Sequence, residues 1–262
     1  MDPVTRERLS ATFDSAADSY TASRPGYPQD AVDWLLGGRA GDVLDLGAGS
    51  GALTRALAAA VTGRLVAAEP SSNLLLELRA AAPTASAVRA GAEQLPFADG
   101  SFDVVTVATA FHWFDASRAV AEISRVLRPG GHLSLVWNTR SVTVAWTREL
   151  DDLLRAAQPA TLTEDWGTGS VRALDGSVDF EPREYAAFAH SQWLDRSGLL
   201  HLVASRSYVI ALDEAPRRAL LEAVGALFDD AGAPTDAGAA RTVELPYRAQ
   251  CWRAAVRRTT SA

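Results

Sequence analysis

The sequence contains no lysine, because each of its 25 basic residues is an arginine. This absence excludes a Schiff-base lysine and the lysine of a phosphate-binding loop, so two large classes of lysine chemistry are ruled out. The heavy use of arginine, alanine and glycine is typical of a GC-rich genome and carries no functional meaning of its own.

Cysteine and clustered metal ligands are equally scarce. Cys251 is the single cysteine, so an internal disulfide is excluded and a reducing compartment, the cytoplasm, is expected. The histidines show no close-spaced pair and no companion cysteine, so we expect no metal site. They are His112, His132, His190 and His201.

Long apolar runs and excess positive charge are also missing. No stretch reaches the length of a membrane span, and the N-terminus lacks a basic segment followed by an apolar one. The net charge of −7 and pI near 5.1 argue against a nucleic-acid-binding surface. We therefore expect a small-molecule substrate, no nucleic acid and no membrane, with the oligomeric state open and a homodimer among the alternatives.

From residue 42 onward, the pattern predicts strands alternating with helices. Such alternation, with nearly continuous apolar strands, indicates an α/β fold with a doubly wound parallel sheet. The predicted strands are 43–46, 65–68, 85–89, 104–108 and 132–137, and the predicted helices between them are 51–60, 71–81 and 116–127.

The flanking segments are interpreted as additions to one domain spanning residues 1–262. Residues 1–40 are predicted to form a helical cover, and 41–138 the cofactor-binding core. The stretch 139–190 is interpreted as an insertion on the substrate side, with a helix near 144–158 and then a glycine-containing loop. Residues 191–262 are predicted to hold helices over 192–230 and a closing strand at 242–256.

The most informative stretch is VLDLGAGSG, residues 43–51. A strand leads into a glycine-rich turn and then a helix, which is typical of a nucleotide-type cofactor site. Gly47, Gly49 and Ala52 also satisfy the dinucleotide fingerprint, so the spacing alone is weak evidence. Asp45 discriminates, because a carboxylate repels a pyrophosphate and attracts the ammonium and sulfonium of S-adenosylmethionine. The alternative is that Asp45 is a strand-end residue that hydrogen-bonds the turn.

Two further segments follow the next predicted strands. Glu69 ends the second strand, where an acidic side chain can accept both hydroxyls of an adenosine ribose and disfavours a 2′-phosphate. The alternative is a solvated charge. Ala92 and Glu93 follow the third strand, where a small residue beside a polar one leaves room for an adenine ring. Taken alone, this last signal is weak.

Aromatic residues gather after the fourth predicted strand, in the run TAFHWFD from Thr109 to Asp115. Ligands of doubly wound sheets bind beyond the carboxyl ends of the strands, so His112 and Trp113 are interpreted as substrate-site residues. For Phe111 and Phe114, a hydrophobic plug between sheet and helix is an equally good interpretation.

Together these segments resemble the class I S-adenosylmethionine-dependent methyltransferases, in the small-molecule branch (methyltransferase type 11) that includes trans-aconitate methyltransferase-like enzymes. The resemblance runs in order from about residue 12 to 138, half of the chain. It is carried by YTASRPGYP, VLDLGAGSG, VAAEPS, AEQLPFADGSFDVV, AFHWFD and LRPGGHLSLVWN.

The resemblance implies a seven-stranded sheet of order 3-2-1-4-5-7-6 with strand seven antiparallel, and S-adenosylmethionine as cofactor. It implies that Tyr20 and Arg24 fold over the site, with Arg24 pairing the cofactor carboxylate. The cofactor-binding set it gives is Tyr20, Arg24, Asp45, Gly47, Gly49, Gly51, Glu69, Ala92, Glu93, Ala108 and Thr109, with Asn138 facing the substrate.

The expected activity is methyl transfer to a small organic molecule, at oxygen in preference to carbon or nitrogen. A carboxylate acceptor needs no base, whereas a hydroxyl does, and His112 is the candidate base or an orienting group. Two rivals stay open: a nicotinamide-dependent oxidoreductase, and a protein of the same fold that transfers no methyl group.

Overall fold

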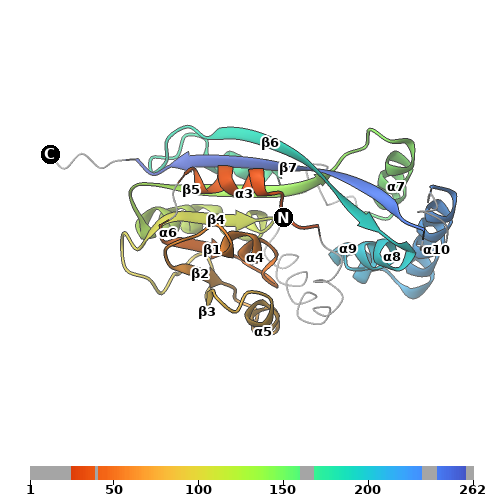
Figure 1. Ribbon diagram of the computed structural model, residues 1–262, viewed down its shortest axis with the longest axis horizontal. Helices are drawn as coiled ribbons and strands as arrows, with labels where there is room; N and C mark the ends of the chain where they lie inside the picture. Colours follow the sequence, from red (N-terminus) through yellow and green to blue (C-terminus); the bar gives the residue numbers. More distant parts are fainter. Residues whose placement is uncertain (1–24, 39–40, 160–167, 232–240, 258–262) are drawn as a thin grey trace. The chain divides into compact units, whose positions relative to one another are not determined.

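The computed structural model describes residues 25–38, 41–159, 168–231 and 241–257. Seven strands form one sheet in the order β3-β2-β1-β4-β5-β7-β6 (Figure 1). The strands are β1 (Val43–Leu46), β2 (Leu65–Ala68), β3 (Ser86–Val88), β4 (Phe102–Ala108), β5 (Leu127–Arg140), β6 (Glu184–Leu194) and β7 (Val243–Ala255). This order confirms the fold expected from the resemblance.

The first five strands are parallel, and β7 runs against β5. Asp45 in β1 lies opposite Ala67 of β2 and Thr106 of β4. Along β7, Val256 N donates to Gly131 O at 2.9 Å, and Ser141 N donates to Pro246 O at 2.9 Å. Residue numbers therefore increase along β5 in the direction in which they decrease along β7. β7 is therefore antiparallel, as expected.

Helices cover both faces of the parallel strands, which explains why every residue of β1 and β2 is buried. One core lies under α6, η1 and η2, and the other under α3 and α4. The helices are α3 (Gln29–Leu36), α4 (Ala52–Ala58), α5 (Ser72–Ala81), η1 (Phe111–Trp113), α6 (Ala116–Val126), α7 (Ala145–Ala156), η2 (Thr168–Leu174), α8 (Arg196–Ala204), α9 (Ser207–Ile210) and α10 (Glu214–Ala231).

The strand β6 differs from the prediction, which assigned its residues to an insertion and to the start of a helix. Its sequence, EYAAFAHSQWL, has alanine or an aromatic residue at most of the exposed positions, where a surface strand usually carries polar residues, so the period of two is hard to see. Pairing with β7, rather than local propensity, stabilises this segment as a strand.

The strand β5 also begins earlier than predicted. Pro129, Gly130 and Gly131 were expected to close a helix, but they lie inside the strand. A Cβ on Gly131 would lie 2.7 Å from the carbonyl oxygen of Asp103, so only glycine allows β5 to pass this close to β4. The predicted loop around Gly169 and Gly176 instead contains the 3-10 helix η2.

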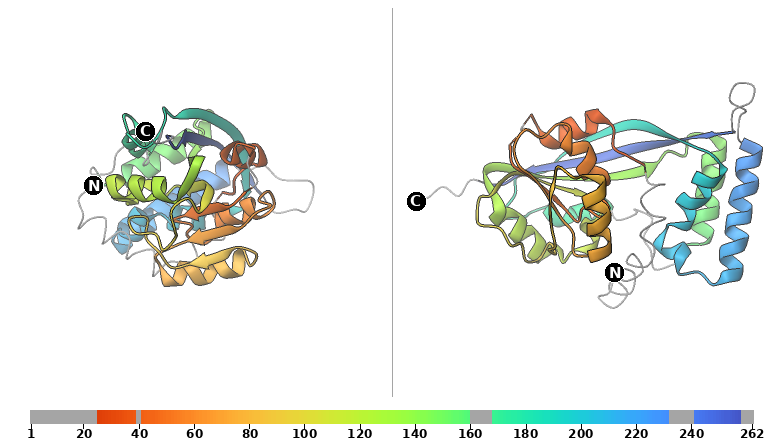
Figure 2. Two further views of the ribbon diagram at one scale, coloured as in Figure 1. Left: turned by 90° about the vertical axis from the view of Figure 1, so that its left-hand side faces the viewer. Right: turned by 60° about the horizontal axis from the view of Figure 1, so that its bottom comes forward.

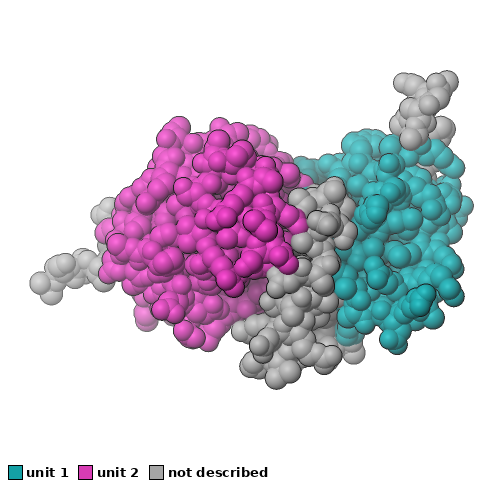
Figure 3. Space-filling view, turned by 90° about the horizontal axis from the view of Figure 1, so that it is seen from below, with its two compact units in different colours: residues 1–25, 139–164, 189–248 teal, residues 26–138, 165–188, 249–262 magenta. Residues whose placement is uncertain are grey.

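The contacts divide the chain into two compact units (Figure 3). One comprises residues 26–138, 165–188 and 249–262, and the other residues 1–25, 139–164 and 189–248. In the second unit, α10 packs against both α7 and α8 (Figure 2). The assignment of residues 1–262 to a single domain stays a prediction.

Candidate active site

The glycine turn after β1 is shaped by three left-handed residues. Gly47, Gly49 and Gly51 have φ values of 65°, 57° and 87°, which side-chain-bearing residues rarely adopt. A Cβ on Gly47 would lie 2.8 Å from the Cβ of Ala110, whereas a Cβ on Gly49 would meet none of the described residues within 4 Å. The described residues thus pack against the turn at Gly47 and leave it uncovered at Gly49.

The carboxylate of Glu69 holds this turn from the end of β2. Its Oε2 accepts from Gly49 N and its Oε1 accepts from Ser71 N, both at 2.9 Å. The residue is only 6% exposed. The two bonds hold the carboxylate between the glycine turn and the start of α5.

Asp45 is fully buried beneath the turn and contacts two hydroxyl groups. Thr54 Oγ1 of α4 donates to Asp45 Oδ2 at 2.6 Å, and Thr106 Oγ1 of β4 donates to Oδ1 at 3.1 Å. Burial raises the pKa of Asp45 to about 6, the two hydroxyl bonds oppose that rise, and the charge of Glu69 adds to it. Asp45 therefore acts on a ligand through its charge and through the shape of the turn, because its side chain is 0% exposed.

The sequence did not identify Thr54 and Thr106. Thr106 lies directly opposite Asp45 on the neighbouring strand, and only the pairing of β1 with β4 reveals this position. The signal for Thr54 was its position in the first turn of the helix that follows the glycines.

The loop after β4 carries backbone strain. Thr109 has a φ of 53°, the single positive value among the non-glycine residues that the structure describes. A β-branched residue in this region is a true outlier, and such strain concentrates at functional sites. Thr109 N donates to Val136 O at 2.8 Å, which fixes the strained peptide at the end of β4, directly after Ala108.

The helix η1 places the aromatic run beside the glycine turn. Phe111 is 1% exposed and belongs to the core, and the partly buried Phe114 packs against it edge to face with ring centroids 5.7 Å apart. The ring of Phe114 lies 3.2 Å from where a Cβ of Gly47 would be. His112 and Trp113 are half-buried with their ring centroids 4.8 Å apart.

The loop after β3 is tied to the same region. Glu93 Oε1 accepts from Asp115 N at 2.8 Å, and Ala92 is buried in the core. Farther along the loop, Leu95 N donates to Glu122 Oε2 at 2.8 Å. Bonds from Arg125 and from Leu95 N lower the pKa of Glu122 to about 2. The sequence did not identify this support from α6.

Asn138 lies near the end of β5, where its Nδ2 donates to Gly26 O at 3.0 Å. Tyr20 and Arg24 lie outside the described residues. The structure thus brings together the residues that follow β1, β2, β3 and β4.

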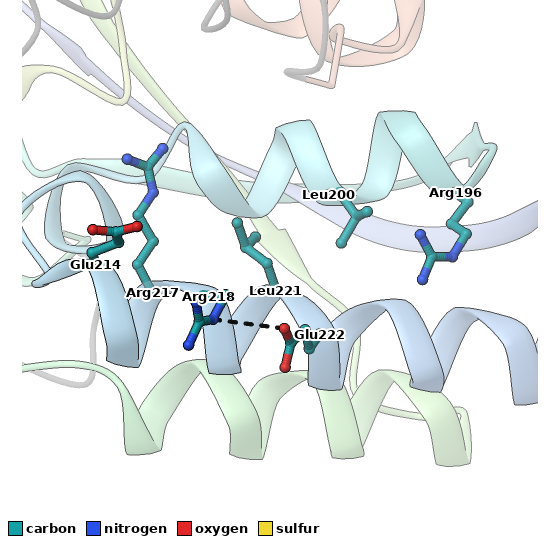
Figure 4. Close-up of a pocket in the computed structure, with 7 residues that line it drawn as sticks. All are labelled: Arg196, Leu200, Glu214, Arg217, Arg218, Leu221 and Glu222. Carbon is teal, nitrogen blue, oxygen red and sulfur yellow. Dashed lines mark ion pairs between the residues drawn. The ribbon is translucent and has the colours of Figure 1, made fainter.

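A surface hollow of about 380 Å³ lies elsewhere, between α8 and α10 (Figure 4). Its charges are largely matched, since Arg218 pairs with Glu222 at 3.8 Å and Arg196 pairs with Asp229 at 3.2 Å. It shares no residue with the strand ends. The chemistry therefore points to the loops after β1 to β4 and not to this hollow.

Two features are absent from the described part of the chain. No group of three or more histidine, cysteine, aspartate or glutamate side chains is arranged there to hold a metal ion. None of the helices there has the length and apolar character needed to cross a bilayer.

Known proteins resemble this chain at three levels. Residues 44–135 match the methyltransferase domain family. An uncharacterized methyltransferase of Mycobacterium tuberculosis is 39% identical over 254 residues, covering 95% of this chain and 97% of that protein. An uncharacterized methyltransferase-like protein of Schizosaccharomyces pombe is 33% identical, covering 78% of this chain and 80% of that protein. The solved structure of a proposed type II methyltransferase from Anaeromyxobacter dehalogenans aligns with a TM-score of 0.66 at 25% identity, covering 89% of this chain and 97% of that one.

Proposed function

Since the chain belongs to the class I methyltransferase family, we propose that it transfers a methyl group from S-adenosylmethionine to an oxygen atom of a small organic molecule. One observation carries the choice of cofactor. Asp45 is a fully buried carboxylate under the glycine turn. Its negative charge favours a cationic ligand and disfavours a diphosphate at this place.

The turn fits such a cofactor on the evidence of its own contacts. Among the described residues nothing would contact a Cβ at Gly49, which suits the approach of a ligand to the backbone, and the carboxylate of Glu69 beside it is an acceptor of the kind that ribose hydroxyls need.

We assign the remaining cofactor contacts to residues around this turn. Ala92 and Glu93 are proposed to border the adenine, and the backbone of Ala108 and Thr109 the methionine part. The loop contact between Glu93 and Asp115 N supports this, because it holds the segment after β3 next to the segment after β4. Tyr20 and Arg24 are proposed to cover the cofactor.

When bound, the cofactor supplies a methyl group on a sulfonium, which a good nucleophile displaces in line. The task of the chain is then to hold the acceptor in line and to exclude water. We propose that His112 removes the proton of a hydroxyl acceptor and that Trp113 and Asn138 orient it. The half-buried imidazole in η1, beside the strained end of β4, supports that role.

We also propose that the protein works in the cytoplasm. The sole cysteine, Cys251, is buried, and burial raises the pKa of its thiol to about 12. An unpaired, unreactive thiol suits a reducing compartment.

Two measurements test the proposal. Titration calorimetry with S-adenosylhomocysteine and with NAD is expected to show binding of the first alone. Incubation with S-adenosylmethionine and a panel of acids, phenols and lipids is then expected to release S-adenosylhomocysteine, with mass spectrometry locating the new methyl group on oxygen. NAD binding would overturn the cofactor assignment, and a methyl group on carbon or nitrogen would overturn the choice of oxygen. Binding without release for any acceptor would favour a protein that keeps the fold without the transfer.

A further inference from the structure

The chain crosses from β3 to β4 through a long loop. Residues 89–101, all of which the structure describes, contain neither helix nor strand. Ordered loops of this length inside a compact fold usually have a function. Because the hydrogen bonds of a helix or strand do not hold this segment, its conformation depends on the side chains that contact it. The loop includes Ala92 and Glu93, which are proposed above to border the adenine.

One guanidinium on α6 donates to three acceptors of this loop. Arg125 Nη1 donates to Phe97 O and to Asp99 Oδ1, both at 2.8 Å, and Arg125 Nη2 donates to Leu95 O at 3.1 Å. The same side chain makes a bidentate pair with Glu122, from Nε to Oε1 and from Nη2 to Oε2, both at 2.8 Å. Every N–H donor of the guanidinium is therefore used.

Glu122 bonds the loop as well, so Arg125 and Glu122 act together and are here called the α6 pair. Glu122 Oε2 accepts from Leu95 N at 2.8 Å, so the α6 pair binds both the N–H and the C=O of Leu95. Leu95 is 4% exposed and belongs to the core. Glu93 lies two positions earlier and accepts from Asp115 N at 2.8 Å. The α6 pair thus fixes the backbone next to the residues assigned to the adenine.

This arrangement does more than an ordinary surface ion pair, which contributes little and needs no fixed geometry. The bidentate carboxylate sets the plane of the guanidinium of Arg125, and that plane determines where its remaining N–H groups point. A loop that is already ordered loses less conformational entropy when a ligand binds to it. The α6 pair therefore lowers the cost of binding at the loop.

We propose that Arg125, together with Glu122, is a positioning residue of the cofactor site that holds residues 89–101 in the shape that receives the adenine of S-adenosylmethionine. It acts through the loop and is assigned no contact with the cofactor. The inference rests on the proposed function, because it requires the adenine to lie beside Ala92 and Glu93. The order of the loop, however, is measured without any ligand.

Amide hydrogen exchange of the free protein tests whether the α6 pair orders the loop. Arg125→Gln is expected to speed exchange within residues 89–101 about tenfold or more. Arg125→Lys keeps the charge and so protects the fold, and it should also speed exchange because lysine lacks the planar fork. Arg128→Gln is the matched control, since Arg128 also binds two carboxylates, but those of Asp42 and Asp103, outside the loop. Unchanged exchange in both Arg125 variants would overturn the proposal.

Calorimetry with S-adenosylhomocysteine tests whether the ordered loop serves the cofactor. Arg125→Gln is expected to weaken binding about tenfold, whereas Arg128→Gln should weaken it less than about twofold. Combined with Glu93→Ala, Arg125→Gln should have a much smaller effect, because the two changes act on one loop. Combined with Asp45→Asn it should keep its full effect, because Asp45 contacts Thr54 and Thr106 and shares no partner with the α6 pair.

These measurements separate the positioning role from the proposed function. A wild type that does not bind S-adenosylhomocysteine would overturn the cofactor assignment, and the role of the α6 pair in adenine binding with it. If the wild type binds, equal losses of affinity in Arg125→Gln and Arg128→Gln would overturn the positioning role alone. Fully additive effects of Arg125→Gln and Glu93→Ala would do the same.

Discussion

At the scale of single residues, the most consequential feature is a carboxylate that is buried without a cation among its described contacts. Asp45 receives only the hydroxyls of Thr54 and Thr106, and the charge of Glu69 opposes its ionisation. A buried charge of this kind costs stability unless a ligand compensates it. The residue therefore links the stability of the free protein to its affinity for a cation.

Replacement of Asp45 by asparagine is expected to stabilise the free protein and weaken cofactor binding. The folded pKa of about 6 lies above the ordinary value of 3.8, so Asp45 contributes most to stability at low pH, and that contribution falls as pH rises through about 6. Above that pH, Asp45→Asn removes a cost of up to about 3 kcal/mol. Urea unfolding between about pH 5 and about pH 8 measures the gain, and calorimetry with S-adenosylhomocysteine measures the lost affinity.

The matched control is Asp42→Asn, for which the sign is opposite. A hydrogen bond from Arg128 is the largest of the effects that lower the pKa of Asp42, so its ionised form is stabilised by folding and its loss should destabilise the protein near neutral pH. A less stable Asp45→Asn with full cofactor affinity would leave Asp45 a purely structural residue.

Replacement of His112 by alanine separates catalysis from packing. If His112 is the base for a hydroxyl acceptor, His112→Ala should lower turnover about 100-fold or more while the affinity for S-adenosylhomocysteine stays unchanged. Steady-state kinetics with a hydroxyl and a carboxylate acceptor provide the comparison, since only the hydroxyl needs a base. His201→Ala, at an exposed site on α8, is the control. Intact turnover would make His112 a packing residue.

At the scale of elements, the side chain that packs against α10 explains why Gly225 stands in the interior of this helix. The guanidinium of Arg196, from α8, lies where a Cβ of Gly225 would be. Glycine in a helix interior is about 1 kcal/mol less favourable than alanine. The close approach of the two helices here thus depends on the missing side chain.

The variant Gly225→Ala is expected to stabilise the protein more when Arg196 is absent. In an Arg196→Ala background the gain should reach about 1 kcal/mol from helix propensity. In the wild type it should be smaller, because the guanidinium must move and its exposed pair with Asp229 weakens. Thermal unfolding of the two single variants and the double variant gives the coupling. Equal gains in both backgrounds would mean that Arg196 does not constrain Gly225.

At the scale of the whole molecule, each compact unit has its own buried residues. The described cofactor-site residues, from Asp45 to Thr109, all belong to the unit that contains residues 26–138. Its two cores lie on opposite faces of the parallel strands. The position of the glycine turn therefore depends on the folding of that unit.

Ligand binding should therefore appear as a gain in thermal stability. At a concentration about 100 times its dissociation constant, S-adenosylhomocysteine should add about 2.7 kcal/mol to the free energy of unfolding of the state it binds. Differential scanning calorimetry measures the shift, with NAD at the same concentration as the control. An equal shift with NAD would contradict the cofactor assignment.

Much of the fold was determined by the sequence alone, because its signals are local. Alternating apolar and helical segments predicted β1 to β4, and Ser71 caps α5 as expected, accepting from Leu74 N at 3.3 Å. The glycine turn was predictable for the same reason, since positive φ values require glycine at Gly47, Gly49 and Gly51. The family motifs added the strand order.

Only the tertiary structure decided what depends on partners far apart in the chain. The strand β6 forms because β7 pairs with it, and its own residues show no clear period. Asp45 is enclosed by Thr54 and Thr106 because strand pairing brings β4 beside β1 and the turn folds α4 back over both. The pKa of a buried carboxylate is set by such neighbours and by the loss of water, neither of which is encoded at the position itself.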